Sequence, residues 1–264
     1  MVDFTITSNF LWLPLIGFVI GLLVTIFGGG GGFFYVPILI LLFHVNTQLA
    51  VVTSLAATIP TVIVGSIEHY KKGNIDLKVG VIFGVAGLIG ALLGAYISHL
   101  ISSSLLKKLF GLYSILLTVP MILTSKNRLK NLNNKTIVSK PLTSIRTLLC
   151  SFFGILSGLM AGLFGTSGTA SIVAGLYILG LPVTIIVGTS VLVVLFNAVS
   201  GLAGHLLVGQ FNLMLFLLLG SGSIIGGFLG PRILAKINVQ TLEKVYGILF
   251  ILLVLSCGII MFFK

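Results

Sequence analysis

Five consecutive glycines interrupt an apolar run in the sequence FGGGGGFFYVP, residues 27–37. Each glycine costs roughly 1 kcal/mol relative to alanine inside a helix, so five in succession predict that the helix formed by residues 11–43 breaks there. A second apolar run, residues 148–181, is interrupted in the same way by GLMAGLFGTSG, residues 158–168. The fold is therefore expected to contain two broken helices.

The composition of the whole chain is that of a membrane protein. Of its 264 residues, 57% are hydrophobic and 7% are charged, whereas a soluble domain carries about 25% charged residues. Apolar segments long enough to cross a bilayer recur along the whole length, so we expect an all-α polytopic membrane protein. Lys and Arg lie between these segments without aromatic interleaving, which argues against nucleic acid as a partner. Cys150 and Cys257 lie in apolar stretches without metal-ligand spacing and are expected to be packing residues.

The chain contains an internal repeat. Residues 53–124 align without a gap to residues 189–260, and rare residues coincide. The coinciding residues are Thr53 and Thr189, Ser54 and Ser190, His69 and His205, and six glycine pairs, Gly65/Gly201, Gly73/Gly209, Gly84/Gly220, Gly90/Gly226, Gly94/Gly230 and Gly111/Gly247. With a one-residue offset, Phe27, Gly28 and Gly31 also match Phe164, Gly165 and Gly168. We therefore expect two homologous halves.

Each half is expected to contain a glycine-broken segment followed by three transmembrane helices. These helices are predicted over residues 48–68, 79–99 and 106–124 in the first half, and over 184–206, 213–235 and 241–263 in the second. The predicted division is a first repeat, 1–124, a basic linker, 125–147, and a second repeat, 148–264.

The distribution of Lys and Arg predicts the topology. If each broken segment returns to its own side, twelve Lys and Arg lie on the linker side against three opposite, whereas complete crossing gives ten against five. The positive-inside bias favours the first arrangement, an inverted repeat with a cytoplasmic linker and an external N-terminus. The expected location is the plasma or inner membrane of the cell.

The two breaks are the predicted binding site. Backbone interrupted within a membrane is tolerated only where protein or a water-filled cavity satisfies it, and the N-terminus of the next helix attracts anions. Two such loops related by pseudo-symmetry are expected to meet at one midplane pocket, with Tyr35 just beyond the first. The candidate anion ligands are Gly28, Gly29, Gly30, Gly31 and Gly32 in the first break and Gly165, Thr166, Ser167, Gly168 and Thr169 in the second.

Polar residues within the following helices are further candidates for the same site. His69 and His205 are able to bind an anion or carry a proton, or they lie at the headgroup boundary, where we also expect His44 and His99. Thr53, Ser54, Thr189 and Ser190 either face the pocket or act as caps and interhelical contacts, and Asn197 either lines the pocket or bonds another helix.

The acidic residues bear on energy coupling. Asp3, Glu68, Asp76 and Glu243 all lie at segment ends or in loops, so no carboxylate is placed to bind Na⁺ or H⁺ inside the membrane. An anion leaving an inside-negative cell gains about 2.3 kcal/mol per charge per 100 mV. The sequence is therefore better suited to anion efflux than to uphill uptake.

Three stretches together resemble the sulfite exporter TauE/SafE family: residues 27–37, residues 158–168 and Gly188-Thr189-Ser190. The resemblance covers nearly the whole chain and implies a permease for small sulfur oxyanions or organosulfonates, such as sulfite, thiosulfate or sulfoacetate. A channel-like anion pathway is the alternative. The absence of clustered carboxylates, a Ser-His-Asp set or HExxH argues against an enzyme, and no cofactor is expected. The expected partners are the small anion, the lipid bilayer and, as an open alternative, a second copy of the chain.

Overall fold

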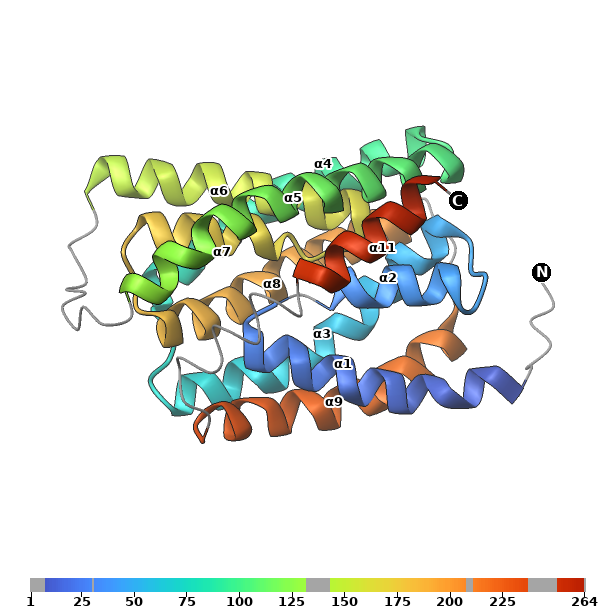
Figure 1. Cartoon of the computed structure of the whole chain (residues 1–264), viewed down its shortest axis with the longest axis horizontal. Coiled ribbons are helices and arrows are strands. Elements are labelled where there is room, and N and C mark those ends of the chain that lie inside the picture. Colours follow the sequence, from blue (N-terminus) through green and yellow to red (C-terminus); the bar gives the residue numbers. More distant parts are fainter. Residues whose placement is uncertain (1–7, 30, 132–142, 208–210, 237–250, 264) are drawn as a thin grey trace.

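The computed structural model describes residues 8–29, 31–131, 143–207, 211–236 and 251–263, and all regular structure within them is helical. Figure 1 shows the helices arranged roughly side by side along the long axis. In chain order they are η1 (Ser8–Trp12), α1 (Leu13–Phe27), α2 (Gly32–Leu41), α3 (Thr47–Lys71), α4 (Leu77–Leu100), α5 (Ser103–Asn131), α6 (Ser144–Phe164), α7 (Thr169–Ile178), α8 (Val183–Leu206), α9 (Leu213–Leu234) and α11 (Ile251–Phe263). Six spans in the described part are long and apolar enough to cross a membrane. The predicted all-helical membrane fold is confirmed.

Both predicted helix breaks are present. α1 ends at Phe27 and is capped by Gly28, whose φ of +66° is in the left-handed region, and α2 begins at Gly32. α6 ends at Gly165, with φ of +68°, and α7 begins at Thr169. Left-handed backbone is the usual way to end a helix and favours glycine, which explains why both helices end at this residue type.

Each broken helix returns toward the end from which it came. In Figure 1, α1 runs inward from the end that carries the N-terminus, and α2 runs back toward that end. α6 starts at the opposite end, and α7 returns toward it. The two broken segments therefore enter the bundle from opposite ends.

Glycines allow the broken helices to pack closely against α4 and α9. α6 lies along α4, and α1 lies along α9. A Cβ built at Gly158 would overlap the carbonyl oxygen of Gly87, and one built at Gly222 would overlap that of Pro14. Small residues at such crossings let backbones approach closely, which drives helix association in lipid.

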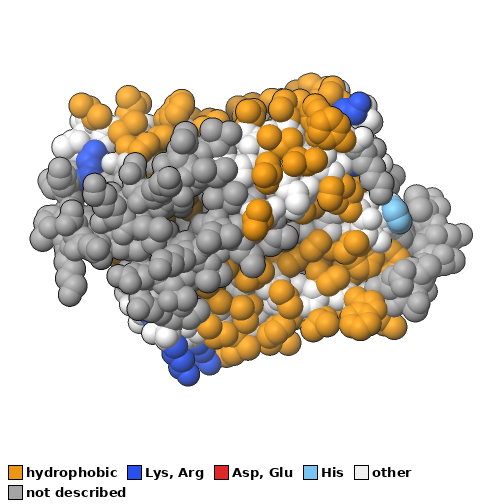
Figure 2. All heavy atoms as spheres, in the orientation of Figure 1, with side chains coloured by type: hydrophobic (Ala, Val, Ile, Leu, Met, Phe, Trp, Pro, Cys, Tyr) orange, Lys and Arg blue, Asp and Glu red, His pale blue; other side chains and the backbone are white. Residues whose placement is uncertain are grey.

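The centre of the bundle is formed by α3 and α8, which contact each other. Their most apolar windows are 72% and 67% buried, against 39–44% for the other candidate spans. Figure 2 shows hydrophobic side chains over most of the described surface on one face, with Lys and Arg near the ends. This distribution suits a lipid-facing perimeter around two central helices.

The helices extend beyond the predicted repeat boundaries. α5 continues to Asn131, and α6 already begins at Ser144, so part of the predicted linker range 125–147 is helical. Most of the predicted final helix is present as α11, while residues 237–250 lie outside the described part. The division into two repeats and a linker remains a prediction.

The glycine crossing generates a stability prediction. Gly158→Ala is expected to destabilise the folded protein by about 1–3 kcal/mol, because its methyl group would overlap Gly87 on α4. Gly220→Ala is the control, since a Cβ there would have its nearest neighbour, Phe216 Cε2, at 3.5 Å. Thermal unfolding in detergent measures both. Equal melting temperatures for the two variants would contradict the close crossing.

Candidate functional site

The two helix breaks meet inside the bundle. A Cβ built at Gly32 would overlap the carbonyl oxygen of Gly165 and Cα of Thr166, so only glycine fits at this contact. Gly29 lies near the methyl group of Thr169, to which a built Cβ would be 4.0 Å away. The described residues of both breaks are buried, whereas Gly30 lies outside the described part. The predicted meeting of the two loops is therefore present in the structure.

Serine hydroxyls bind the carbonyl groups at the helix ends in a crosswise arrangement. Ser54 Oγ, on α3, donates to the Gly165 carbonyl at 3.0 Å. Ser190 Oγ, on α8, donates to the Gly28 carbonyl at 2.6 Å, the shorter of its two contacts, the other being the Val187 carbonyl of its own helix at 2.8 Å. Each serine lies in the opposite half of the sequence from the break it binds. The last carbonyls of a helix have no partner within it, so these serines satisfy groups that would otherwise be buried unpaired.

The two aligned histidines perform a similar task within their own halves. His69 Nε2 donates to the Thr25 carbonyl at 2.9 Å, and His205 Nε2 donates to the Gly162 carbonyl at 2.7 Å. Both side chains are fully buried, and neither Nδ1 has a hydrogen-bond partner in the described part of the chain. His99, expected at an interface, has its ring centroid 5.1 Å from that of His205. The histidines therefore bind helix ends one turn before each break.

The aligned threonines have different surroundings. Thr189 Oγ1 accepts the backbone N–H of Asp76 at 2.9 Å, which joins α8 to the turn before α4. Thr53 Oγ1 is fully buried and has no hydrogen-bond partner among the described residues. Thr53 thus has a hydroxyl without a partner in the described part of the chain, whereas Thr189 Oγ1 already accepts one hydrogen bond.

Polar groups gather at the second break. Ser167 is fully buried in the left-handed conformation, with φ of +62°, and its Oγ has no partner within the described residues. Asn197 Nδ2 donates to the Ser167 carbonyl at 3.3 Å. Thr166 Oγ1 donates to the Met160 carbonyl at 3.3 Å. The structure therefore brings Ser167 and Asn197 together.

The first break is held by contacts that sequence reasoning missed. Ser223 Oγ donates to the Leu219 carbonyl, so the hydroxyl of Tyr35 is the donor in its 2.7 Å hydrogen bond to Ser223. This bond joins α2 to α9 across 188 positions of sequence. Neither partner has an aligned counterpart of the same type, so the repeat gives no signal for the pair.

Aromatic rings from α5 lie beside both breaks. Tyr113 stacks on Phe33, just after the first break, and on Phe164, just before the second, with centroid distances of 6.1 and 5.1 Å. Phe110 also contacts both rings. α5 therefore links the two broken segments through apolar contacts.

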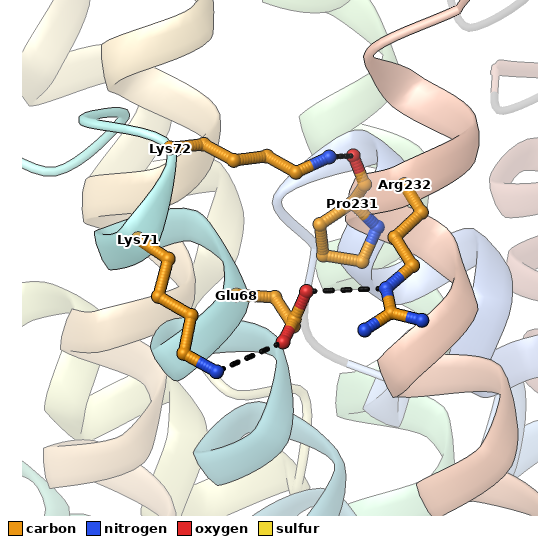
Figure 3. Close-up of polar contacts among 5 residues, drawn as sticks. All are labelled: Glu68, Lys71, Lys72, Pro231 and Arg232. Carbon is orange, nitrogen blue, oxygen red and sulfur yellow. Dashed lines mark hydrogen bonds and ion pairs between the residues drawn. The ribbon is translucent and has the colours of Figure 1, made fainter.

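A cluster of charged side chains joins the end of α3 to the end of α9 (Figure 3). Glu68, on α3 and 7% exposed, pairs with Arg232 Nε on α9 at 3.2 Å and with Lys71 Nζ at 3.5 Å. Lys72 Nζ donates to the Pro231 carbonyl at 2.7 Å near the end of α9, and Arg232 also lies 3.6 Å from the ring centroid of Phe228. The Glu68 carboxylate thus forms ion pairs with two basic side chains, which its position at a segment end did not reveal.

The polar groups at the breaks are backbone groups and hydroxyls. No group of three His, Cys, Asp or Glu side chains capable of holding a metal occurs in the described ranges. The breaks instead offer helix N-termini, which carry about half a positive charge each, and hydroxyl groups.

Known proteins resemble this chain along most of its length. The model of the family described as sulfite exporter TauE/SafE matches residues 13–257. The probable membrane transporter protein YunE of Bacillus subtilis is 29% identical over 96% of this chain and 97% of its own length. YdhB of the same organism, also described as a probable membrane transporter protein, is 30% identical over 89% of this chain and 97% of its own. A probable membrane transporter protein of Xylella fastidiosa is 30% identical over 90% of this chain and 88% of its own.

No solved structure matches the chain. The matched family and relatives confirm the resemblance inferred from the glycine motifs, and they confirm a transporter rather than an enzyme.

Crosswise capping generates a second stability prediction. Ser190→Ala is expected to lower the free energy of unfolding by about 1–3 kcal/mol, because it leaves the buried Gly28 carbonyl without this donor. The control is Ser221→Ala, since Ser221 is exposed and donates to the Leu218 carbonyl of its own helix. Detergent unfolding monitored by circular dichroism measures the difference. A Ser190→Ala protein as stable as the control would argue against the capping bond.

The charged cluster is testable by a double-mutant cycle. Glu68→Gln and Arg232→Gln, alone and combined, are expected to show a coupling energy of about 1 kcal/mol, because each loses the same ion pair. The Lys71 side chain is 65% exposed, so the cycle of Glu68→Gln with Lys71→Gln is expected to give weaker coupling. Strictly additive effects of Glu68→Gln and Arg232→Gln would show that this pair does not join α3 to α9.

Proposed function

The chain belongs to the sulfite exporter TauE/SafE family of membrane transporters, and on that premise we propose that it exports a small sulfur oxyanion such as sulfite. The anion binds where the two helix breaks meet. The observation that carries the proposal is the contact between these breaks, Gly32 against Gly165 and Thr166, inside a chain with six candidate membrane spans.

The chemistry of the breaks favours an oxyanion. α2 and α7 are ten residues long, and their N-termini lie at the breaks. N–H groups in the first turn of a helix have no partner within the helix and bind anions readily. Ser167 Oγ and Thr53 Oγ1 add buried hydroxyls that have no partner in the described part of the chain. A trigonal or tetrahedral oxyanion accepts several such hydrogen bonds at once.

The proposed site includes two kinds of residue. The backbone and hydroxyl groups of the breaks, with Thr53, contact the anion directly. A second set holds the breaks in place by binding their carbonyls or neighbouring segments: Ser54, Ser190, Thr189, His69, His205 and Asn197. The glycines that align between the two breaks, Gly28 with Gly165 and Gly31 with Gly168, have no side chain and leave the backbone room to approach the ligand.

We further propose that the two halves form an inverted repeat that works by alternating access. Three features support this arrangement: the aligned sequence, the entry of α1 and α6 from opposite ends in Figure 1, and the crosswise serine bonds. Lys71, Lys72 and Arg232 meet at one end (Figure 3), and the positive-inside bias assigns that end and the linker to the cytoplasm of the cell membrane. With this orientation, an inside-negative potential favours anion exit.

The test is sulfite efflux from proteoliposomes that hold purified protein, at clamped membrane potentials and several pH values. Flux is expected to rise with inside-negative potential and to saturate. Ser167→Gly is expected to retain the fold, because glycine adopts φ of +62° without strain, and to raise the KM for sulfite about tenfold through the lost hydroxyl.

Melting temperatures in detergent serve as the folding control for Ser167→Gly. An unchanged KM in a folded variant would remove the second break from the binding site. Flux that never saturates would favour a channel-like pathway. Flux of thiosulfate or an organosulfonate without flux of sulfite would reassign the substrate.

A further inference from the structure

Asn197 joins three segments at the second break. The residue lies on α8, and its side chain is fully buried in the protein. Nδ2 donates to Ser157 Oγ on α6 at 3.1 Å and to the Ser167 carbonyl at 3.3 Å. This amide therefore contacts both the helix before the break and the break itself.

Chemistry fixes which way the amide faces. Ser157 Oγ donates its own proton to the Gly154 carbonyl at 2.8 Å, so it is available to Asn197 only as an acceptor. The Ser167 carbonyl is also an acceptor. Both contacts require the NH₂ group of Asn197, and its Oδ1 must point away from them.

Holding the Ser167 carbonyl determines the direction of the next amide. The described residues include no cis peptide bond, and in a planar trans peptide C=O and N–H point in opposite directions. The N–H of Gly168, the residue that directly precedes α7, therefore points away from Asn197. Ser167 and Gly168 have φ of +62° and +65°, a conformation that a non-glycine residue adopts at some cost. Asn197 thus holds a strained peptide at the N-terminus of a helix.

Stability alone does not explain this asparagine. Its Oδ1 is buried and has no hydrogen-bond partner in the described ranges. A Cβ built at Gly87 would overlap this oxygen, so α4 needs glycine there to accommodate the side chain. A buried carbonyl without a partner costs free energy that an apolar side chain of similar volume would avoid.

The first half lacks the same device. Thr61, aligned with Asn197, donates to the Ala57 carbonyl of its own helix at 2.9 Å and also contacts the Tyr35 hydroxyl, but it binds no backbone carbonyl of the first break in the described part of the chain. The segment after the first break is tied instead by Tyr35 to Ser223 on α9. Asn197 therefore acts on the second break alone.

We propose that Asn197 is a positioning residue for anion transport, which orients the Ser167–Gly168 peptide so that the Gly168 N–H and the second break are presented to a small oxyanion. The inference rests on the proposed function and deepens it, because it makes the second break the discriminating half of the site. Asn197 acts through the backbone that it holds.

The experiment compares four variants in proteoliposomes. Asn197→Asp places an oxygen against the Ser167 carbonyl, and Asn197→Thr copies the first half. Ser157→Ala removes only the second acceptor. Ser200→Ala is the matched control, because Ser200 also joins α8 to a neighbouring segment, with a hydrogen bond to the Leu88 carbonyl of α4 at 2.7 Å.

Both Asn197 variants are expected to raise the KM for sulfite about tenfold, with a smaller change in maximal rate, because the loss is in binding geometry. Ser157→Ala is expected to raise KM about twofold to threefold. Ser200→Ala is expected to leave the KM at its wild-type value. A folded Asn197→Thr protein with wild-type KM would overturn the proposal, as would an equal rise in KM for Ser200→Ala.

Hydrogen exchange separates this inference from the proposed function. Both Asn197 variants are expected to accelerate amide exchange in a peptide covering residues 165–170, whereas Ser200→Ala leaves it unchanged. Absence of sulfur-oxyanion transport by the wild-type protein in proteoliposomes would refute the proposed function. Unchanged exchange at the second break in both Asn197 variants would refute the positioning role, whatever the substrate.

Discussion

A carbonyl at the end of a buried helix must find a donor, and this requirement organises the centre of the molecule. α1 and α6 both end inside the bundle, where a carbonyl group without a hydrogen-bond donor costs free energy. The donors come from the two most buried spans, α3 and α8, as Ser54, His69, Ser190 and His205. The polar residues of these central helices are therefore required by the breaks themselves, before any ligand is considered.

The glycines meet the complementary requirement of space. Positive φ ends α1 at Gly28 and α6 at Gly165, and the absence of a side chain at Gly32 lets the first break touch the second. Glycines along α4 and α6 extend the same close approach to the perimeter. The broken helices are thus held on one side by glycine crossings and at their ends by hydroxyl and imidazole donors, which leaves the half-helices α2 and α7 to present their N-termini.

The sequence predicted the fold better than the contacts of the site. The free-energy cost of glycine inside a helix predicted both breaks. The internal repeat identified Ser54, Ser190, His69 and His205 as a related set. It did not reveal that each serine binds the opposite break, because that depends on how the halves dock. Tyr35 with Ser223, and Ser157 with Asn197, join residues far apart in the chain whose aligned positions hold other residue types, so the repeat does not indicate which residues pair. Glu68 looked like an ordinary residue at a helix end until α9 brought Arg232 beside it.

The two kinds of cap differ in what they imply for movement between the proposed halves. Each histidine binds a carbonyl of its own half, Thr25 for His69 and Gly162 for His205. Both partners of each bond would therefore move together with that half. Each serine bond crosses between halves, and so does the pair of Glu68 with Arg232. Rocking one half against the other therefore preserves the histidine bonds and strains the serine bonds. In the proposed mechanism, an anion bound at the breaks adds contacts in the same region, and its binding energy offsets that strain when the halves rearrange.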